Sequence, residues 1–159
     1  MPSYDPHALA VALAHGALLV VGARLIAVDI AEHRLPDRIV LPALGATLLL
    51  VLGDAVCTGE TAAMGRGLAG MIGLCAFYAL LRGVSRGGMG GGDVKLAAVI
   101  GLVLAWHGWS ALVIGAAAAF ALGALSALAL LLARRADGAT MIAFGPWMIL
   151  GAVLGIGLG

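Results

Sequence analysis

The chain has 159 residues, of which 63% are hydrophobic and 11% charged, and its mean hydropathy is +1.13. Soluble domains carry roughly 25% charged residues, so a soluble fold of this length could not bury so many apolar side chains. The composition predicts one membrane domain over residues 1–159 in a lipid bilayer, and the net charge of +1 gives no support for a nucleic-acid partner.

Apolar runs separated by charged clusters predict an all-α integral membrane protein, a polytopic bundle of about six transmembrane helices. The first run has no basic segment before it and carries Asp5, which favours a membrane span over a cleaved signal peptide. The fourth run is short, and we expect it to begin inside the protein, with Asp93 and Lys95 near its N-terminal end. The six candidate spans are residues 8–28, 39–56, 67–81, 94–106, 109–133 and 142–158.

The basic residues predict the orientation of this bundle. Arg66 follows the second loop, whereas the other Lys and Arg residues lie in or beside loops one, three and five. Because positive residues stay on the cytoplasmic side, these three loops are expected in the cytoplasm and both termini outside the inner membrane. Residues 29 and 93 then emerge at the same cytoplasmic face.

The stretch AVDIAEHRLPDRIVLP carries the first cluster of ionisable residues. Asp29 ends the first apolar run and would be partly desolvated there, which makes it a candidate for function. Pro36 breaks any continuing helix. Glu32, His33 and Asp37 fit a solvated loop, and His33 is too isolated to indicate a metal ligand.

The stretch SRGGMGGGDVKLAAVIG places Asp93 between a glycine run and an apolar helix. A structural reading makes Asp93 a first-turn acid that satisfies free backbone N–H groups. The glycines argue for more, because a surface without side chains lets an extended peptide approach. The phosphate-binding patterns G-x-x-x-x-G-K-[ST] and G-x-G-x-x-G do not occur around it.

Several catalytic chemistries find no support in the residues. Cys57 and Cys75 lack a C-x-x-C spacing, the histidines are scattered singly, and no serine has a G-x-S-x-G setting. Two carboxylates from different helices could instead share one proton, because like charges at close range cannot both ionise. Asp29 and Asp93 could then hydrolyse a peptide bond without a metal. Two other readings stay open: an ion-coupled carrier that uses both acids as cation sites, and a non-catalytic assembly scaffold.

Three motifs together resemble the type IV prepilin peptidases. They are the pattern D-x-x-x-x-x-x-P-D from Asp29 to Asp37, the run GMGGGDVKL that contains Asp93, and the segment IAFGPWMILGA at 142–152. The motifs occur in the family's order, and the similarity spans roughly residues 20 to 155.

The resemblance implies an intramembrane aspartic endopeptidase that cuts the leader from prepilins or pilin-like proteins at the cytoplasmic membrane face, typically after a glycine. It implies Asp29 and Asp93 as the catalytic pair and no cofactor. It leaves open whether the protein acts as a homodimer. Supporting or substrate-loop roles would fall to Pro36, Asp37, Gly90, Gly91, Gly92, Lys95, Gly145 and Pro146, with Lys95 holding Asp93 or the motif loop and Phe144 helping to shape the last helix.

One departure from the larger bacterial members concerns methylation. Those members carry paired C-x-x-C motifs in an N-terminal cytoplasmic segment, and this sequence has only Cys57 and Cys75. We therefore expect no methyltransferase activity and no use of S-adenosylmethionine. The layout is similar to the short peptidases of Tad-type pilus systems.

Overall fold

The computed structural model describes residues 22, 24, 37–85, 89–133 and 143–159. Within these ranges every regular element is an α-helix, which agrees with the all-α expectation. The helices are α2 (Asp37–Thr58), α3 (Thr61–Val84), α4 (Gly91–His107), α5 (Trp109–Leu132) and α6 (Gly145–Leu158). The first expected span, 8–28, lies outside the described residues except for two helical positions, Gly22 and Arg24, so the count of six helices stays a prediction.

The other five expected spans each coincide with a helix, although the boundaries differ. The largest difference is in α3, which begins at Thr61 rather than at residue 67 and contains Arg66. The Arg66 guanidinium Nη2 donates a hydrogen bond of 3.5 Å to the backbone oxygen of Trp106, near the C-terminal end of α4. Helix C-termini carry partial negative charge. The Arg66 cation can therefore lie within α3, against the end of α4, and α3 does not have to begin after it.

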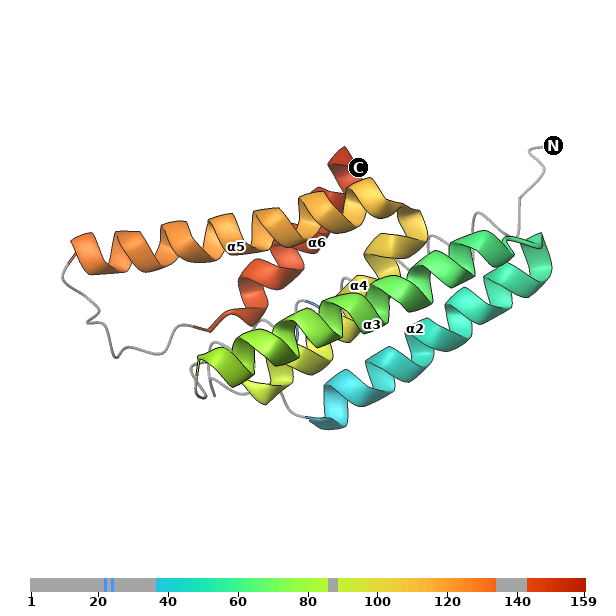
Figure 1. The fold of residues 1–159 in the computed structure, drawn as a ribbon, viewed down its shortest axis with the longest axis horizontal. Coiled ribbons are helices and arrows are strands. Elements are labelled where there is room, and N and C mark those ends of the chain that lie inside the picture. Colours follow the sequence, from blue (N-terminus) through green and yellow to red (C-terminus); the bar gives the residue numbers. More distant parts are fainter. Residues whose placement is uncertain (1–21, 23, 25–36, 86–88, 134–142) are drawn as a thin grey trace.

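Helix α4 forms the centre of the bundle. It packs against α2, α3, α5 and α6, and its residues from Leu96 to Leu102 are buried without interruption. A helix that is apolar on every side belongs inside a protein or a membrane. Figure 1 shows the antiparallel α2–α3 pair on one side of α4 and the α5–α6 pair on the other.

Glycines allow the helices to approach each other closely. A Cβ added to Gly70 of α3 would lie 2.6 Å from the backbone oxygen of Gly101 in α4. A Cβ added to Gly151 of α6 would lie 2.5 Å from the backbone oxygen of Gly115 in α5. Both distances are far below van der Waals contact, so only glycine fits at these crossings. Small residues at helix crossings are typical of membrane proteins.

The described helices have the character of a multi-pass membrane protein. Helices α2, α3 and α5 are long and apolar enough to cross a bilayer, and α6 is a shorter apolar helix. Large apolar side chains remain on their outer faces, with Leu49 72%, Val56 76% and Leu80 68% exposed. Contiguous apolar surface of this kind is tolerated in lipid but would cause a soluble protein to aggregate.

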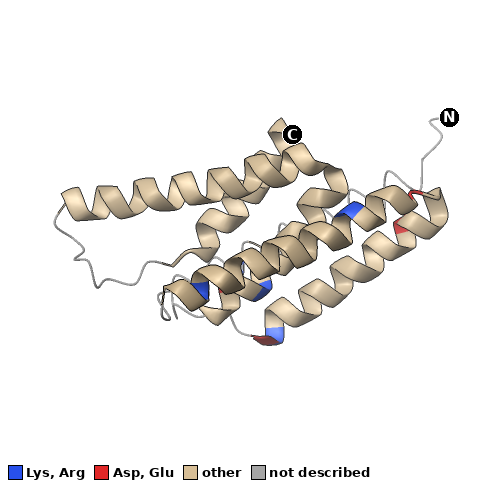
Figure 2. Cartoon of the chain, viewed as in Figure 1, with Lys and Arg blue, Asp and Glu red and all other residues tan. Residues whose placement is uncertain are grey.

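The two ends of the bundle differ in charge. Arg38 at the start of α2, Arg82 at the end of α3 and Lys95 at the start of α4 lie at one end, which we call the motif end. Asp54, Glu60 and Arg66 lie at the opposite end, and Figure 2 shows both groups. The motif end therefore holds most of the described basic residues.

Candidate active site

The candidate site is built around the first turn of α4. The N-cap is Gly90, with φ −65° and ψ 145°, and Asp93 is the third helical residue. The backbone N–H of Gly90 donates to Asp93 Oδ2 at 3.2 Å, so this carboxylate satisfies one of the N–H groups that a helix start leaves unpaired. The structural reading of Asp93 as a first-turn acid is therefore confirmed.

Asp93 is also one of the few buried polar side chains among the described residues. Its side chain is 7% exposed, and among the described residues the only other buried polar side chain is that of Thr47. Thr47 satisfies its hydroxyl within α2, by donating to the backbone oxygen of Ala43 at 2.7 Å. Removing a carboxylate from water costs free energy, which cap formation alone does not require, because helix-capping acids are usually solvated. Asp93 is thus a carboxylate that the fold keeps largely out of water at the start of α4.

Lys95 contacts Asp37, although we expected it to hold Asp93 or the motif loop. Its Nζ lies 2.5 Å from Asp37 Oδ1, and the two side chains are 39% and 57% exposed. Exposed ion pairs of this kind contribute only about 0–1 kcal/mol to stability. The pair has a geometric effect instead, because it joins the first residue of α2 to the first turns of α4.

Arg82 lies beside the candidate site, although its place in the sequence indicated only a charge at the cytoplasmic side. It lies in the last turn of α3, and its guanidinium covers Gly91, since a Cβ added there would lie 3.2 Å from Arg82 Cζ. Gly91 and Gly92 form the first two residues of α4. The glycine run thus lets a guanidinium approach the helix backbone beside Asp93. A basic residue at a helix C-terminus is the signal that could have indicated this position.

The F-G-P segment begins the last helix and packs against α3 and α5. Gly145 is buried and opens α6, and Pro146 follows at a position where the missing N–H is not needed. The Phe144 ring lies over Gly123 of α5, where an added Cβ would be 3.2 Å from Phe144 Cδ2. On its other side the ring contacts Tyr78 of α3, with 6.1 Å between ring centroids.

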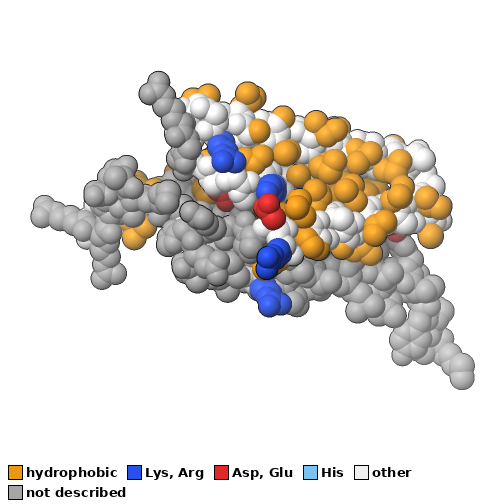
Figure 3. Space-filling view, turned by 90° about the horizontal axis from the view of Figure 1, so that it is seen from below, with side chains coloured by type: hydrophobic (Ala, Val, Ile, Leu, Met, Phe, Trp, Pro, Cys, Tyr) orange, Lys and Arg blue, Asp and Glu red, His pale blue; other side chains and the backbone are white. Residues whose placement is uncertain are grey.

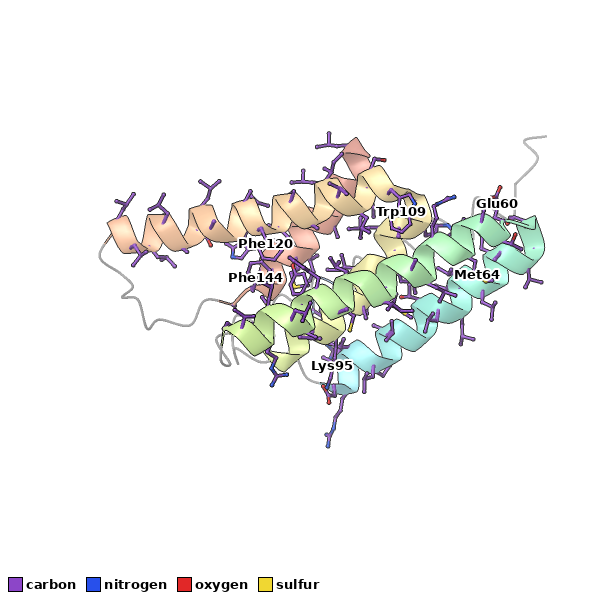
Figure 4. All side chains as sticks on the ribbon, viewed as in Figure 1. Glu60, Met64, Lys95, Trp109, Phe120 and Phe144 are labelled. Atoms are coloured by element: carbon purple, nitrogen blue, oxygen red, sulfur yellow. The ribbon has the colours of Figure 1, made fainter. Side chains whose placement is uncertain are left out.

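Figure 4 shows Phe120 and Phe144 directed toward one another, with Lys95 near the start of α4. In the space-filling view of Figure 3, basic and acidic side chains gather in one region beside a broad hydrophobic surface. Charged groups and apolar surface thus meet at the motif end, as expected at the level of a membrane interface.

Comparison with known proteins identifies the family. The sequence pattern of the type IV leader peptidase family matches residues 16–159. The chain belongs to the type IV leader peptidase family. It is 36% identical over 144 residues to a prepilin leader peptidase/N-methyltransferase of Dickeya chrysanthemi, covering 89% of this chain and 50% of that protein.

Two further relatives carry the same name. The protein of Stutzerimonas stutzeri is 33% identical over 137 residues, covering 84% of this chain and 46% of its own length. The protein of Aeromonas hydrophila is 38% identical over 125 residues, covering 76% of this chain and 41% of its own length. The chain therefore spans about half the length of the curated relatives it matches, and no solved structure matches it.

Two of the expected site residues of this leader peptidase family member lie outside the described residues. They are Asp29, the expected catalytic partner of Asp93, and Pro36. The structure brings Asp37 to Lys95 in the first turns of α4, which also hold Asp93, and it places Phe144 of the F-G-P segment against Tyr78 of α3. Within the described ranges no three His, Cys, Asp or Glu side chains are grouped as metal ligands, and both cysteines are free thiols.

Proposed function

We propose that the chain is an aspartic-type endopeptidase of the inner membrane that removes the leader from prepilins or pilin-like proteins. Asp29 and Asp93 are the catalytic pair, and the motif end faces the cytoplasm, with both termini outside. The observation that carries this proposal is the burial of Asp93 at the start of α4, in a chain whose family members are named leader peptidases.

The proposed pairing of Asp29 with Asp93 is supported by the described residues on either side of Asp29. A Cβ added to Gly22 would lie 3.4 Å from Ile149 Cγ2, in the second turn of α6. Asp37 is paired with Lys95. Helices α4 and α6 both start at the motif end, as the contact between Tyr78 and Phe144 indicates. Gly22 and Asp37, which precede and follow Asp29 in the sequence, thus contact α6 and α4, the two helices that start at the motif end, and this supports the proposed pairing.

The chemistry follows from two carboxyl groups that hold one proton. The ionised carboxylate takes a proton from a water molecule while the water oxygen attacks the scissile carbonyl carbon. The protonated carboxyl group gives its proton to the carbonyl oxygen. When the tetrahedral intermediate collapses, one of its hydroxyl groups returns a proton to the carboxylate that protonated the carbonyl, the C–N bond breaks, and the leaving amine takes the proton that the other carboxyl group had accepted from water. Each carboxyl group ends the cycle ready to repeat it.

The substrate is proposed to lie in the bilayer with its own apolar helix beside the bundle and its leader in the cytoplasm. A helix pairs its backbone carbonyls internally and so protects them from attack. A glycine before the cut lowers the cost of leaving the helical conformation. Gly90, Gly91 and Gly92 leave a surface at the start of α4 on which such an extended segment can lie.

Separate Asp29→Asn and Asp93→Asn variants test this proposal. Asparagine keeps the shape of aspartate, and at position 93 its side-chain oxygen can still accept the hydrogen bond from Gly90. It cannot exchange a proton, so cleavage should fall at least about 100-fold in either variant. The measurement is cleavage of a purified prepilin by purified enzyme in lipid, with enzyme levels compared in membranes. Near wild-type cleavage by either variant would show that the pairing is wrong. An Asp54→Asn variant, at the opposite end, is the matched control and should cleave normally.

A further inference from the structure

The Arg82 side chain reaches from the last turn of α3 to the first turn of α4. A Cβ added to Gly91 would lie 3.2 Å from Arg82 Cζ and 3.5 Å from Nη2, and it would lie closer still to Nη1. The planar guanidinium therefore packs against the bare backbone of this glycine. A side chain at position 91 would push the cation away, so the glycine is what allows it to lie beside the turn that carries Asp93.

The guanidinium of Arg82 differs in its contacts from two other described cations. Lys95 Nζ contacts Asp37 Oδ1, and Arg66 Nη2 donates to the backbone oxygen of Trp106. Within the described ranges the Arg82 guanidinium makes no hydrogen bond or ion pair of its own. A guanidinium carries five N–H donors in one plane, so those of Arg82 are open to an acceptor that arrives with a substrate.

An extended substrate segment brings such acceptors to this place. When the residues around the cut leave the helical conformation, their carbonyl oxygens lose their partners within the helix, and an unpaired carbonyl is costly where water is scarce. The proposed surface for this segment is formed by Gly90, Gly91 and Gly92, which offer no side-chain donor. Arg82 lies against Gly91 and supplies N–H groups beside that surface.

We infer that Arg82 is a substrate-positioning residue, whose guanidinium donates hydrogen bonds to main-chain carbonyls of the extended substrate segment and holds the scissile bond beside Asp93. The inference rests on the proposed function. A contact to carbonyls next to the cut is made equally in the bound substrate and in the transition state. Such a contact strengthens substrate binding and leaves the chemical step unchanged.

The test is an Arg82→Ala variant of the full chain, assayed with a purified prepilin in lipid. We expect KM to rise about 10-fold, the effect of losing a hydrogen bond to a charged group, and kcat to stay within about twofold of the wild type. Arg38→Ala is the matched control. It removes an exposed cation at the same end of the bundle, away from the glycine surface, and should keep the wild-type KM.

An Arg82→Lys variant separates carbonyl recognition from charge alone. Lysine keeps the positive charge at the C-terminal end of α3, but it lacks the planar fork that donates two parallel hydrogen bonds. We expect its KM to lie between those of the wild type and Arg82→Ala. A wild-type KM in Arg82→Lys would show that charge at the end of α3 is sufficient, and the inference would be wrong.

Gly91→Ala tests the position of the guanidinium. In the wild-type background the new Cβ displaces the Arg82 guanidinium, so KM should rise as it does in Arg82→Ala. In the Arg82→Ala background the same change meets no guanidinium and should raise KM no further. Independent increases that multiply in the double variant would contradict an action of Arg82 from its place on Gly91.

The outcomes distinguish this inference from the proposed function. If the wild-type chain does not cut the prepilin, the proposed function fails and the inference falls with it. If the wild type cuts and Arg82→Ala keeps its KM, or loses kcat alone, the inference is wrong and the proposed function stands. If Arg82→Ala does not accumulate in membranes, Arg82→Met replaces it with the same expectation, because methionine keeps a long side chain without N–H donors.

Discussion

At the scale of single residues, the structural role of Asp93 suits it to the chemistry that we propose for it. Its Oδ2 accepts the hydrogen bond that begins α4, which holds the carboxyl group in place before any substrate arrives. The same side chain is only 7% exposed. A helix start supplies both properties at once, because it presents aligned N–H donors at the edge of an apolar helix.

The ion pair of Lys95 with Asp37 leads to a prediction about activity rather than stability. Lys95→Ala and Asp37→Ala should each lower cleavage severalfold, because either change releases the start of α2, and with it the segment that carries Asp29, from α4. The free energy of unfolding should change by less than about 1 kcal/mol, because the pair is exposed. Cleavage rates and thermal unfolding of the purified variants measure the two effects.

The charge-reversed double variant, Asp37→Lys with Lys95→Asp, is the decisive comparison. It restores the attraction with opposite polarity and should recover most of the cleavage that the single variants lose. Arg38→Ala changes a neighbouring exposed charge without breaking the pair and serves as the control. Equal cleavage by the wild type and both alanine variants would contradict a positioning role for the pair.

The burial of Asp93 at a helix start followed from local sequence, because a glycine run stops at an acid and an apolar run begins. The partner of Lys95 did not follow. Asp37 lies 58 positions away, and only the packing of α2 against α4 brings the two together.

At the scale of helices, the glycine crossings explain why the bundle holds a short, largely buried α4. Apolar runs predicted where the helices lie, but not which face of each meets a neighbour, because nearly every face is apolar. Gly70 and Gly73 on α3 illustrate the difference. A Cβ on Gly70 would meet the backbone of Gly101, whereas a Cβ on Gly73 would meet nothing within 4 Å. Helix α3 thus has one glycine that packs tightly against α4 and another that faces away from its neighbours.

This contrast gives a stability prediction with its own control. Gly70→Ala should destabilise the protein by about 1–3 kcal/mol, because overpacking forces α3 and α4 apart. Gly73→Ala should be neutral or slightly stabilising, because alanine favours a helix over glycine. Thermal unfolding in one detergent measures both variants. A Gly70→Ala protein as stable as the wild type would show that the two helices do not cross at these glycines.

At the scale of the whole molecule, the charge difference between the two ends bears on where cleavage can occur. Arg38, Arg82 and Lys95 lie at the motif end with Asp93. A leader that stays in the cytoplasm can be cut only by a site on that side, so the proposed reaction requires the basic end to be cytoplasmic, as the distribution of positive charge predicts. The orientation of the bundle in the membrane therefore decides whether the proposed site can reach the leader, and this is a question that experiment can settle.

Thiol labelling in intact cells answers it, because the chain offers a natural reporter at one end. Cys57 is exposed near the end of α2, opposite the motif end, and Ser85 is exposed just after α3, at the motif end. In a Cys75→Ala background, a membrane-impermeant maleimide should label Cys57 from outside. A Ser85→Cys variant that also carries Cys57→Ala should react only after the cells are permeabilised. The reverse pattern would place Asp93 on the outer side, where no cytoplasmic leader could reach it, and the proposed cleavage would then be excluded.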